Sequence, residues 1–238
     1  MNTQTPSPKL IDEVEIKVFF DPTQFPQLEE KFHLHQKPHI QRMSCFFDTP
    51  SLHLLKKGVT LRIRLHRKRK DSLTLKLRNL DSHLICQELY DQSRFRLKVN
   101  QSGKQQTQIA KLETRTAKDQ LKQVVAGEKD IQKALNRVQK KLFRQYTGSA
   151  ELLDQLKLYR IVEARIWKWY ERTFPHRLTL EEWFLPSRIL LLELSIKVVP
   201  LEAEAAQKQL YQWLERQNID YDLSQHSKTI ICMTTQNQ

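Results

Sequence analysis

Charged and apolar residues alternate in the segment Glu13-Val14-Glu15-Ile16-Lys17. Side chains alternate between the two faces of a β-strand, so Glu13, Glu15 and Lys17 would share one face. Carboxylates gathered in this way can hold a divalent cation, and a neighbouring ammonium group can orient them or contact a phosphoryl group. Taken alone, the segment would more often be the solvent-facing side of an ordinary strand, so its meaning depends on the rest of the chain.

Two later segments show the complementary, basic pattern. The alternation over 59–64 puts the guanidinium groups of Arg62 and Arg64 on one strand face, and Lys76 is the charged residue of the alternating segment 73–77. Planar guanidinium groups pair well with phosphate oxygens. Acidic and basic strand faces in one chain predict a barrel with a charged interior, which can hold metal ions and a polyanion.

The residues between these strands complete a resemblance to the CYTH domain of the triphosphate tunnel metalloenzymes. That family has an E-x-E-x-K strand, an aromatic-Asp-Thr-Pro turn with a short Leu-rich helix, and an R-x-R strand. The chain matches these features in the same order at 13–17, 46–55 and 62–64. The resemblance covers most of residues 11–233, apart from an insertion.

The resemblance also implies roles for single residues. It implies that Lys17, Glu13 and Glu15 are catalytic, that Arg62, Arg64, Lys76, Arg165 and Lys228 bind phosphate, and that Glu13, Glu15, Glu88, Glu181 and Glu193 hold metal. Carboxylate ligands without a Cys or His cluster favour Mg²⁺ or Mn²⁺ over Zn²⁺. The chain departs from the family pattern at Cys86, Tyr90 and Ser195, where many relatives carry charged residues, so its acidic cluster is smaller.

The implied fold is α+β and mostly β, a closed antiparallel eight-stranded tunnel-like barrel with helices packed outside, in one domain over residues 1–238. The implied function is a metal-dependent triphosphatase that hydrolyses inorganic triphosphate or a related short polyphosphate. Within the family, the alternatives are a class IV adenylyl cyclase and a thiamine or nucleoside triphosphatase. Because the acidic cluster is small, a non-catalytic module that binds polyphosphate or nucleic acid is a further alternative.

The composition favours an anionic ligand. The chain has 40 Lys and Arg against 27 Asp and Glu, a formal net charge of +13. Its four glycines form no phosphate-binding loop, so side chains would have to bind phosphate. The scattered cysteines, the polar N-terminal segment and the absence of a long apolar run predict a cytoplasmic protein without a membrane partner. The sequence does not determine the oligomeric state, for which a homodimer is one option.

Hydrophobic periodicity predicts the elements that position these residues. We expect strands at 12–20, 40–47, 59–67, 72–79, 84–90, 158–171, 176–184 and 188–198. We expect helices at 26–36, 51–57 and 201–217, and a closing segment at 225–233 that carries Lys228.

The segment 98–147 differs in character, because it is rich in Gln and Lys and contains helix-forming runs at 118–125 and 129–143. It has 12 Lys or Arg and 4 Asp or Glu, and 12 minus 4 gives a balance of +8. We interpret it as a helical insertion between two halves of the barrel. It is either a solvated helical pair on the outside or a basic arm for a long polyanion. The lack of interleaved aromatic residues weighs against single-stranded nucleic acid.

Overall fold

The computed structural model describes residues 11–67, 70–79, 87–115, 118–185, 188–224 and 227–235. Within these ranges the chain forms nine β-strands, and their hydrogen-bonded order closes into a barrel as β1-β5-β6-β4-β3-β2-β7-β8-β9. The strands are β1 (Glu13–Phe20), β2 (His39–Asp48), β3 (Val59–His66), β4 (Ser72–Arg78), β5 (Phe95–Ser102), β6 (Gln105–Arg115), β7 (Lys157–Glu171), β8 (Phe174–Leu185) and β9 (Arg188–Val198).

The strand number decides the kind of barrel. The pairs β1–β9, β3–β4, β4–β6, β7–β8 and β8–β9 run antiparallel. A closed ring with an odd number of strands cannot alternate direction all the way round, so at least one neighbouring pair in the described barrel is parallel. The expected closed, mostly β barrel is confirmed. Its eight-stranded, fully antiparallel form is wrong, because the barrel has nine strands and is mixed.

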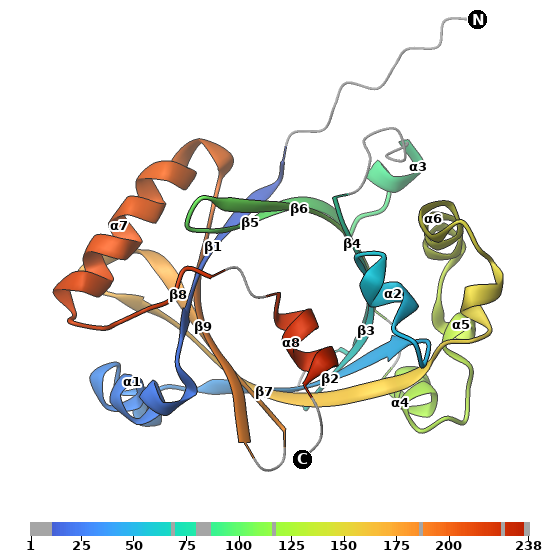
Figure 1. The fold of residues 1–238 in the computed structure, drawn as a ribbon, viewed down its shortest axis with the longest axis horizontal. Coiled ribbons are helices and arrows are strands. Elements are labelled where there is room, and N and C mark those ends of the chain that lie inside the picture. Colours follow the sequence, from blue (N-terminus) through green and yellow to red (C-terminus); the bar gives the residue numbers. More distant parts are fainter. Residues whose placement is uncertain are drawn as a thin grey trace, which may run out of the picture. The chain divides into compact units, whose positions relative to one another are not determined.

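Helices of varied length connect and flank the strands (Figure 1). They are α1 (Phe25–Lys31), α2 (His53–Lys56), α3 (Gln87–Tyr90), α4 (Lys118–Val125), α5 (Ile131–Ala134), α6 (Arg137–Thr147), α7 (Ala203–Arg216) and α8 (Lys228–Thr234). In the described ranges, none of them has the length and apolar character needed to cross a bilayer.

The chain divides into two compact units, and each unit is assembled from segments that are distant in sequence. The first unit consists mainly of residues 45–98 and 107–159. The second consists mainly of residues 13–44 and 160–238.

In the second unit, β1, β9, β8 and β7 form a sheet with two contrasting faces. The register pairs Lys17 with Ser195 and Glu181 with Glu193, so polar and charged side chains gather on one face. The other face is apolar and is covered by α7, whose Trp213 packs against Phe174 of β8 with ring centres 5.2 Å apart. The alternation of period two therefore separates a packed face from a charged one.

In the first unit, β3, β4 and β6 form a second sheet with one charged face. The register pairs Arg62 with Thr74, and Lys76 with Lys111. Directly paired residues lie on the same face of a sheet, so basic side chains from three strands share one face. The alternate positions are apolar and buried, as for Leu75, which is fully buried.

A turn after β2 fixes where β3 begins. The Asp48 carboxylate accepts hydrogen bonds from the backbone N–H groups of Thr49, Leu54 and Leu55 at 2.7, 2.9 and 3.0 Å. The chain then reverses at Gly58, whose φ of 72° favours glycine. The aromatic-Asp-Thr-Pro motif therefore has a structural function, because it holds α2 in place and sets the start of the strand that carries the two arginines.

Three predicted elements differ in the structure. The strand expected at 84–90 is the helix α3 over Gln87–Tyr90, and Cys86 lies outside the described residues. The helical segment expected at 98–147 instead begins with the end of β5 and all of β6, and its second helix is divided into α5 and α6. Asn136 causes that division, because its side chain caps α6 by accepting a hydrogen bond from the backbone of Gln139.

Candidate functional site

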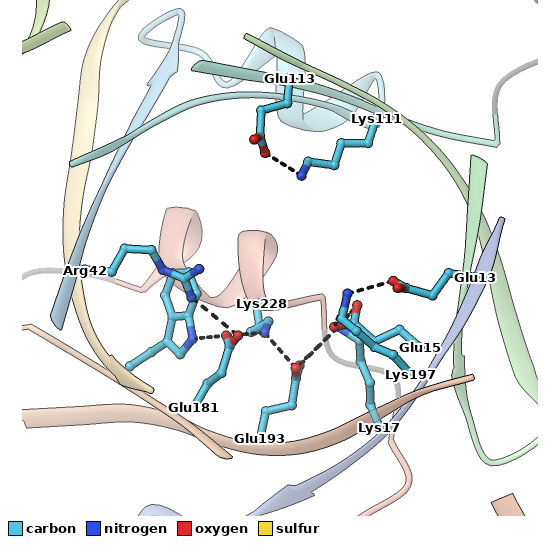
Figure 2. A network of polar contacts seen from close by, with 11 residues as sticks. Glu13, Glu15, Lys17, Arg42, Lys111, Glu113, Glu181, Glu193, Lys197 and Lys228 are labelled. Carbon is cyan, nitrogen blue, oxygen red and sulfur yellow. Dashed lines mark hydrogen bonds and ion pairs between the residues drawn. The ribbon is translucent and has the colours of Figure 1, made fainter. Parts of the chain in front are cut away.

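The charged face of the second unit carries an acidic cluster, which we define as Glu15, Lys17, Glu181, Glu193 and Lys228 (Figure 2). Lys17 Nζ lies 3.2 Å from Glu15 Oε2 and 3.4 Å from Glu193 Oε1. Lys228 Nζ donates to Glu181 Oε2 and to Glu193 Oε1, at 2.6 Å each. Two ammonium groups thus connect carboxylates from β1, β8 and β9.

Glu13 lies beside the acidic cluster in a more exposed position. Its Oε1 accepts a hydrogen bond from Lys197 Nζ at 2.7 Å, and the same ammonium group lies 4.0 Å from Glu15 Oε1. The exposed fraction of the side chain falls from 28% for Glu13 to 18% for Glu15 and 1% for Glu193. The carboxylates therefore form a series from the more exposed Glu13 to the fully buried Glu193.

The cations around these carboxylates keep them ionised. Burial alone would raise the pKa of Glu15, but nearby ammonium groups, that of Lys17 first, hold this pKa well below its usual range. Burial would likewise raise the pKa of Glu181, and Lys228 and Arg42 outweigh it, so that this pKa is also well below its usual range. Both carboxylates are therefore negatively charged near neutral pH, which ligands of a divalent cation must be.

Arg42 on β2 contacts the acidic cluster, although the sequence prediction does not include it. Its Nη2 lies 3.4 Å from Glu181 Oε1, and its guanidinium carbon lies 5.5 Å from the ring centre of Trp183. The indole of Trp183 in turn donates to Glu181 Oε2 at 2.8 Å. Arg42 Nε is buried and makes no hydrogen bond within the described ranges. A buried guanidinium with an unused donor is suited to an anionic ligand.

The charged face of the first unit carries a basic cluster, defined as Arg62, Arg64, Lys76, Lys111 and Glu113. Lys111 Nζ donates to Glu113 Oε2 at 2.6 Å, a contact drawn in Figure 2. Burial lowers the pKa of Lys111 to about 8; Arg64 and Arg62 act in the same direction and Glu113 opposes them. Burial is the largest of these effects, and the two arginines add a smaller repulsion. An anion bound there would relieve that repulsion.

Two residues that the sequence prediction assigned to the site lie elsewhere. Arg165 Nε and Nη2 donate to Glu182 Oε2 and Oε1 at 2.5 and 2.8 Å. The guanidinium carbon lies 5.2 Å from the ring centre of Phe25 in α1, so this pair belongs to the apolar face of the sheet. Glu88 lies on α3, where its Oε2 accepts a hydrogen bond from Lys141 at 2.5 Å. Neither residue joins the cluster of its own unit.

The sequence prediction placed a strand carrying Glu88 after the strand of Lys76. In the structure the strand that pairs with β4 is β6, which carries Lys111 and Glu113. The sequence contains a trace of this, since Lys111-Leu112-Glu113 is a charged, apolar, charged alternation. The helical interpretation of the segment 98–147 concealed it. Arg42 has no comparable trace, because the residues around it alternate only weakly.

The acidic cluster suits a divalent cation chemically, although its oxygens are engaged by lysines. Among the described residues, no three His, Cys, Asp or Glu side chains form a ready-made metal site. Glu15, Glu181 and Glu193 nevertheless offer the hard carboxylate oxygens that Mg²⁺ and Mn²⁺ prefer. Lys228 Nζ lies 2.6 Å from two of these carboxylates, so a positive charge is already held where they converge.

Comparisons with known proteins bear on the family and the fold. The model of the CYTH domain matches residues 12–231, nearly the whole chain. A putative adenylate cyclase from Bacillus halodurans has 15% identity and a TM-score of 0.63, with 96% of this chain and 100% of that chain covered. A putative adenylyl cyclase from Hippeastrum, described as having a dominant triphosphatase activity, has 18% identity and a TM-score of 0.63, with 92% and 93% covered. At these identities the likeness establishes the fold alone. No curated protein matches the sequence.

Proposed function

Because the chain belongs to the CYTH domain family, we propose that it is a metal-dependent triphosphatase that hydrolyses inorganic triphosphate or a related short polyphosphate. The observation that carries the proposal is the acidic cluster, in which carboxylates from three strands converge on ammonium groups. The dominant triphosphatase activity described for the Hippeastrum protein supports the choice of triphosphate hydrolysis over ATP cyclisation.

In this proposal, Glu15, Glu181 and Glu193 hold Mg²⁺ or Mn²⁺, and the more exposed Glu13 assists them. When bound, the divalent cation would neutralise charge on the phosphate oxygens and lower the pKa of a bound water. Lys17 keeps the carboxylates in place. Burial would lower its pKa, but Glu15 and Glu193 raise that pKa above its ordinary value, so Lys17 stays protonated.

The cations of the chain would bind the phosphates. Arg62 and Arg64 present planar forks to phosphate oxygens, and Lys76 adds a further positive charge. Lys228 would exchange a carboxylate partner for a phosphate oxygen, and Arg42 would use its free donor in the same way. Attack of water on the terminal phosphorus, in line with the bridging oxygen, breaks the P–O bond and yields orthophosphate and pyrophosphate.

Two other activities remain as candidates. ATP cyclisation is suggested by the names of both structural relatives, but the acidic and basic clusters consist of groups that recognise phosphate, not a nucleobase. A non-catalytic polyanion-binding module is suggested by Ser195, which stands on β9 where many relatives carry a second acidic residue. Both candidates are separated from the proposal by the products and by the metal dependence.

The decisive experiment measures phosphate release from tripolyphosphate with Mg²⁺ or Mn²⁺, and again with a chelator. We expect metal-dependent release that falls by about 100-fold or more in Glu15→Gln. The matched control is Glu88→Gln, the same substitution at a partly exposed glutamate on α3, and it should retain wild-type turnover. Circular dichroism checks that both variants are folded.

Three results would contradict the proposal. Wild-type turnover in Glu15→Gln would remove the acidic cluster from the mechanism. Cyclic AMP formed from ATP, without phosphate release from tripolyphosphate, would establish the cyclase instead. Binding of tripolyphosphate without turnover, unchanged by the chelator, would establish a binding module.

A further inference from the structure

A hollow of about 500 Å³ on the surface of the first unit is lined, among the described residues, by five residues of the helix α6. They are Arg137, Lys140, Lys141, Arg144 and Gln145. Four of these five residues are cations, and none is acidic. We call these four cations the basic face of α6.

Helical spacing puts these cations on one side. The four cations are spaced i, i+3, i+4 and i+7, at Arg137, Lys140, Lys141 and Arg144. Residues at this spacing share one face of a helix. The opposite side of α6 is anchored in the unit, since Leu142 and Phe143 are buried. Burial of these residues fixes the orientation of the helix, so the basic face is held toward solvent.

The basic face lowers the stability of the helix that carries it. Like charges at i, i+3 and i, i+4 repel one another, and α6 contains no acidic residue to offset them. Arg137 stands in the first turn, where the helix dipole disfavours a cation. An anion bound on this face would reduce the repulsion between the four cations, which favours an anionic ligand.

A carboxylate of the protein already lies on this face. Glu88 of α3 accepts a hydrogen bond from Lys141, which together with the charges of Lys141 and Arg137 lowers the pKa of Glu88 against a small opposing effect of burial. The side chains of Lys140 and Arg144 have no ion-pair partner in the described part of the chain. Half of the basic face is therefore engaged by one internal anion, and half is available to an external one.

We propose that the basic face of α6 binds a linear polyphosphate chain, as an anion site distinct in sequence and in unit from the acidic cluster. The four cations are spread over about 10 Å of helix, given the rise of 1.5 Å per residue, so they can contact successive phosphates of one chain. The five lining residues that the structure describes include no aromatic side chain on which a nucleobase could stack. Polyphosphate consists only of the groups that these cations recognise. The site goes beyond the proposed hydrolysis and does not depend on it.

The test titrates the full-length protein with labelled long-chain polyphosphate, in chelator and at several salt concentrations. We expect Lys140→Ala/Arg144→Ala to weaken binding about tenfold and to reduce the slope of log K against log salt by about 1.4, for two lost phosphate contacts. The matched control is Lys208→Ala/Arg216→Ala on α7, which removes the same two charges from exposed positions. The control should change affinity by less than about twofold. The single charge reversal Arg144→Glu gives an independent check.

Three results would overturn the inference. Equal losses in the α6 and α7 variants would mean that the overall charge binds polyphosphate. An unchanged salt slope in the α6 variants would mean that the basic face makes no phosphate contact. Single-stranded DNA of equal charge that displaces polyphosphate at lower concentration, with the same dependence on Arg144, would assign the face to nucleic acid. Tripolyphosphate turnover, which the α6 variants should retain, tests the proposed function separately.

Discussion

Lys228 Nζ lies 2.6 Å from Glu193 Oε1, and this contact joins the helix α8 to the strand β9. The Glu193 side chain is only 1% exposed, and the same ammonium group also contacts Glu181. A buried carboxylate requires a cationic partner, and here a lysine from near the C-terminus supplies it. A divalent cation held by these two carboxylates would have to compete with that lysine.

The first prediction follows from this competition. Lys228→Ala removes a positive charge that opposes metal binding, so we expect Mn²⁺ to bind about tenfold more tightly to this variant than to the wild type. Isothermal titration calorimetry measures the affinity. Lys228→Arg keeps the charge and should bind Mn²⁺ like the wild type. Weaker binding to Lys228→Ala would show that the lysine organises the carboxylates more than it competes for them.

The second prediction concerns the bidentate pair of Arg165 and Glu182. Arg165→Ala leaves the carboxylate of Glu182 buried without its cation, so we expect a loss of unfolding free energy on the order of 3 kcal/mol. The KM for tripolyphosphate should stay within about twofold of the wild type, because Arg165 lies on the apolar face. Urea unfolding and steady-state kinetics measure the two quantities. A KM raised tenfold in a stable variant would restore the phosphate-binding role expected from the sequence.

The third prediction concerns pH. The pKa of Lys111 is about 8, so this residue loses its proton as pH rises through that value, and the affinity for tripolyphosphate should fall with it. Lys111→Arg keeps its charge and should shift the fall to higher pH. Measuring the KM for tripolyphosphate between about pH 7 and 9.5 tests this in both proteins, because that range brackets the pKa of Lys111. Identical profiles would remove Lys111 from substrate binding.

Lys111 also makes a stability prediction with a definite sign. Its folded pKa of about 8 lies below the ordinary 10.5, so between these values the unfolded chain binds more protons than the folded one. Stability contributed by this group therefore rises with pH across that window, in the absence of ligand. The unfolding free energy of the wild type, compared with Lys111→Met, should increase from pH 8 to 10. A decrease would show that Glu113 outweighs burial.

The fifth prediction tests the two arginines of β3. Arg62→Ala and Arg64→Ala each remove charge-assisted contacts with phosphate, so we expect the KM for tripolyphosphate to rise about 10- to 100-fold with a smaller change in kcat. Arg96→Ala is the matched control, because that exposed arginine on β5 bonds backbone carbonyls. An unchanged KM in both β3 variants would exclude the basic cluster from substrate binding.

The strands with strict alternation could be predicted from the sequence. β1 and β3 each carry charged and apolar residues at period two, and this pattern fixes both the element and the face of Glu15 or Arg62. The closed barrel followed from combining acidic and basic faces. The strand number did not. β5 alternates Phe95, Leu97 and Val99 with polar residues, but its end and the Gln-rich β6 fall in the segment 98–147, whose helix-forming runs led to a helical interpretation of the whole.

Arg165 was misplaced for a different reason. The segment around it has polar and apolar residues at both parities, so alternation alone does not choose a face. Trp167 and Trp169, however, lie two and four residues further along the same strand, and both are buried. Residues at this spacing share a face, so Arg165 had to share it with them. The contact of its guanidinium with the ring of Trp167, at 5.6 Å, shows the result.

The pairing of β1 with β9 has a consequence for synthesis on the ribosome. The register places Val14 opposite Val198, 184 residues later in the chain (198 minus 14). At about 5–20 residues per second, translation of this interval takes roughly 10–40 s. During that time the edge of β1 that pairs with β9 has no partner strand. Charged side chains on an exposed strand disfavour its pairing with another chain. The charges of Glu13, Glu15 and Lys17 would therefore disfavour pairing of β1 with another chain until β9 has been synthesised.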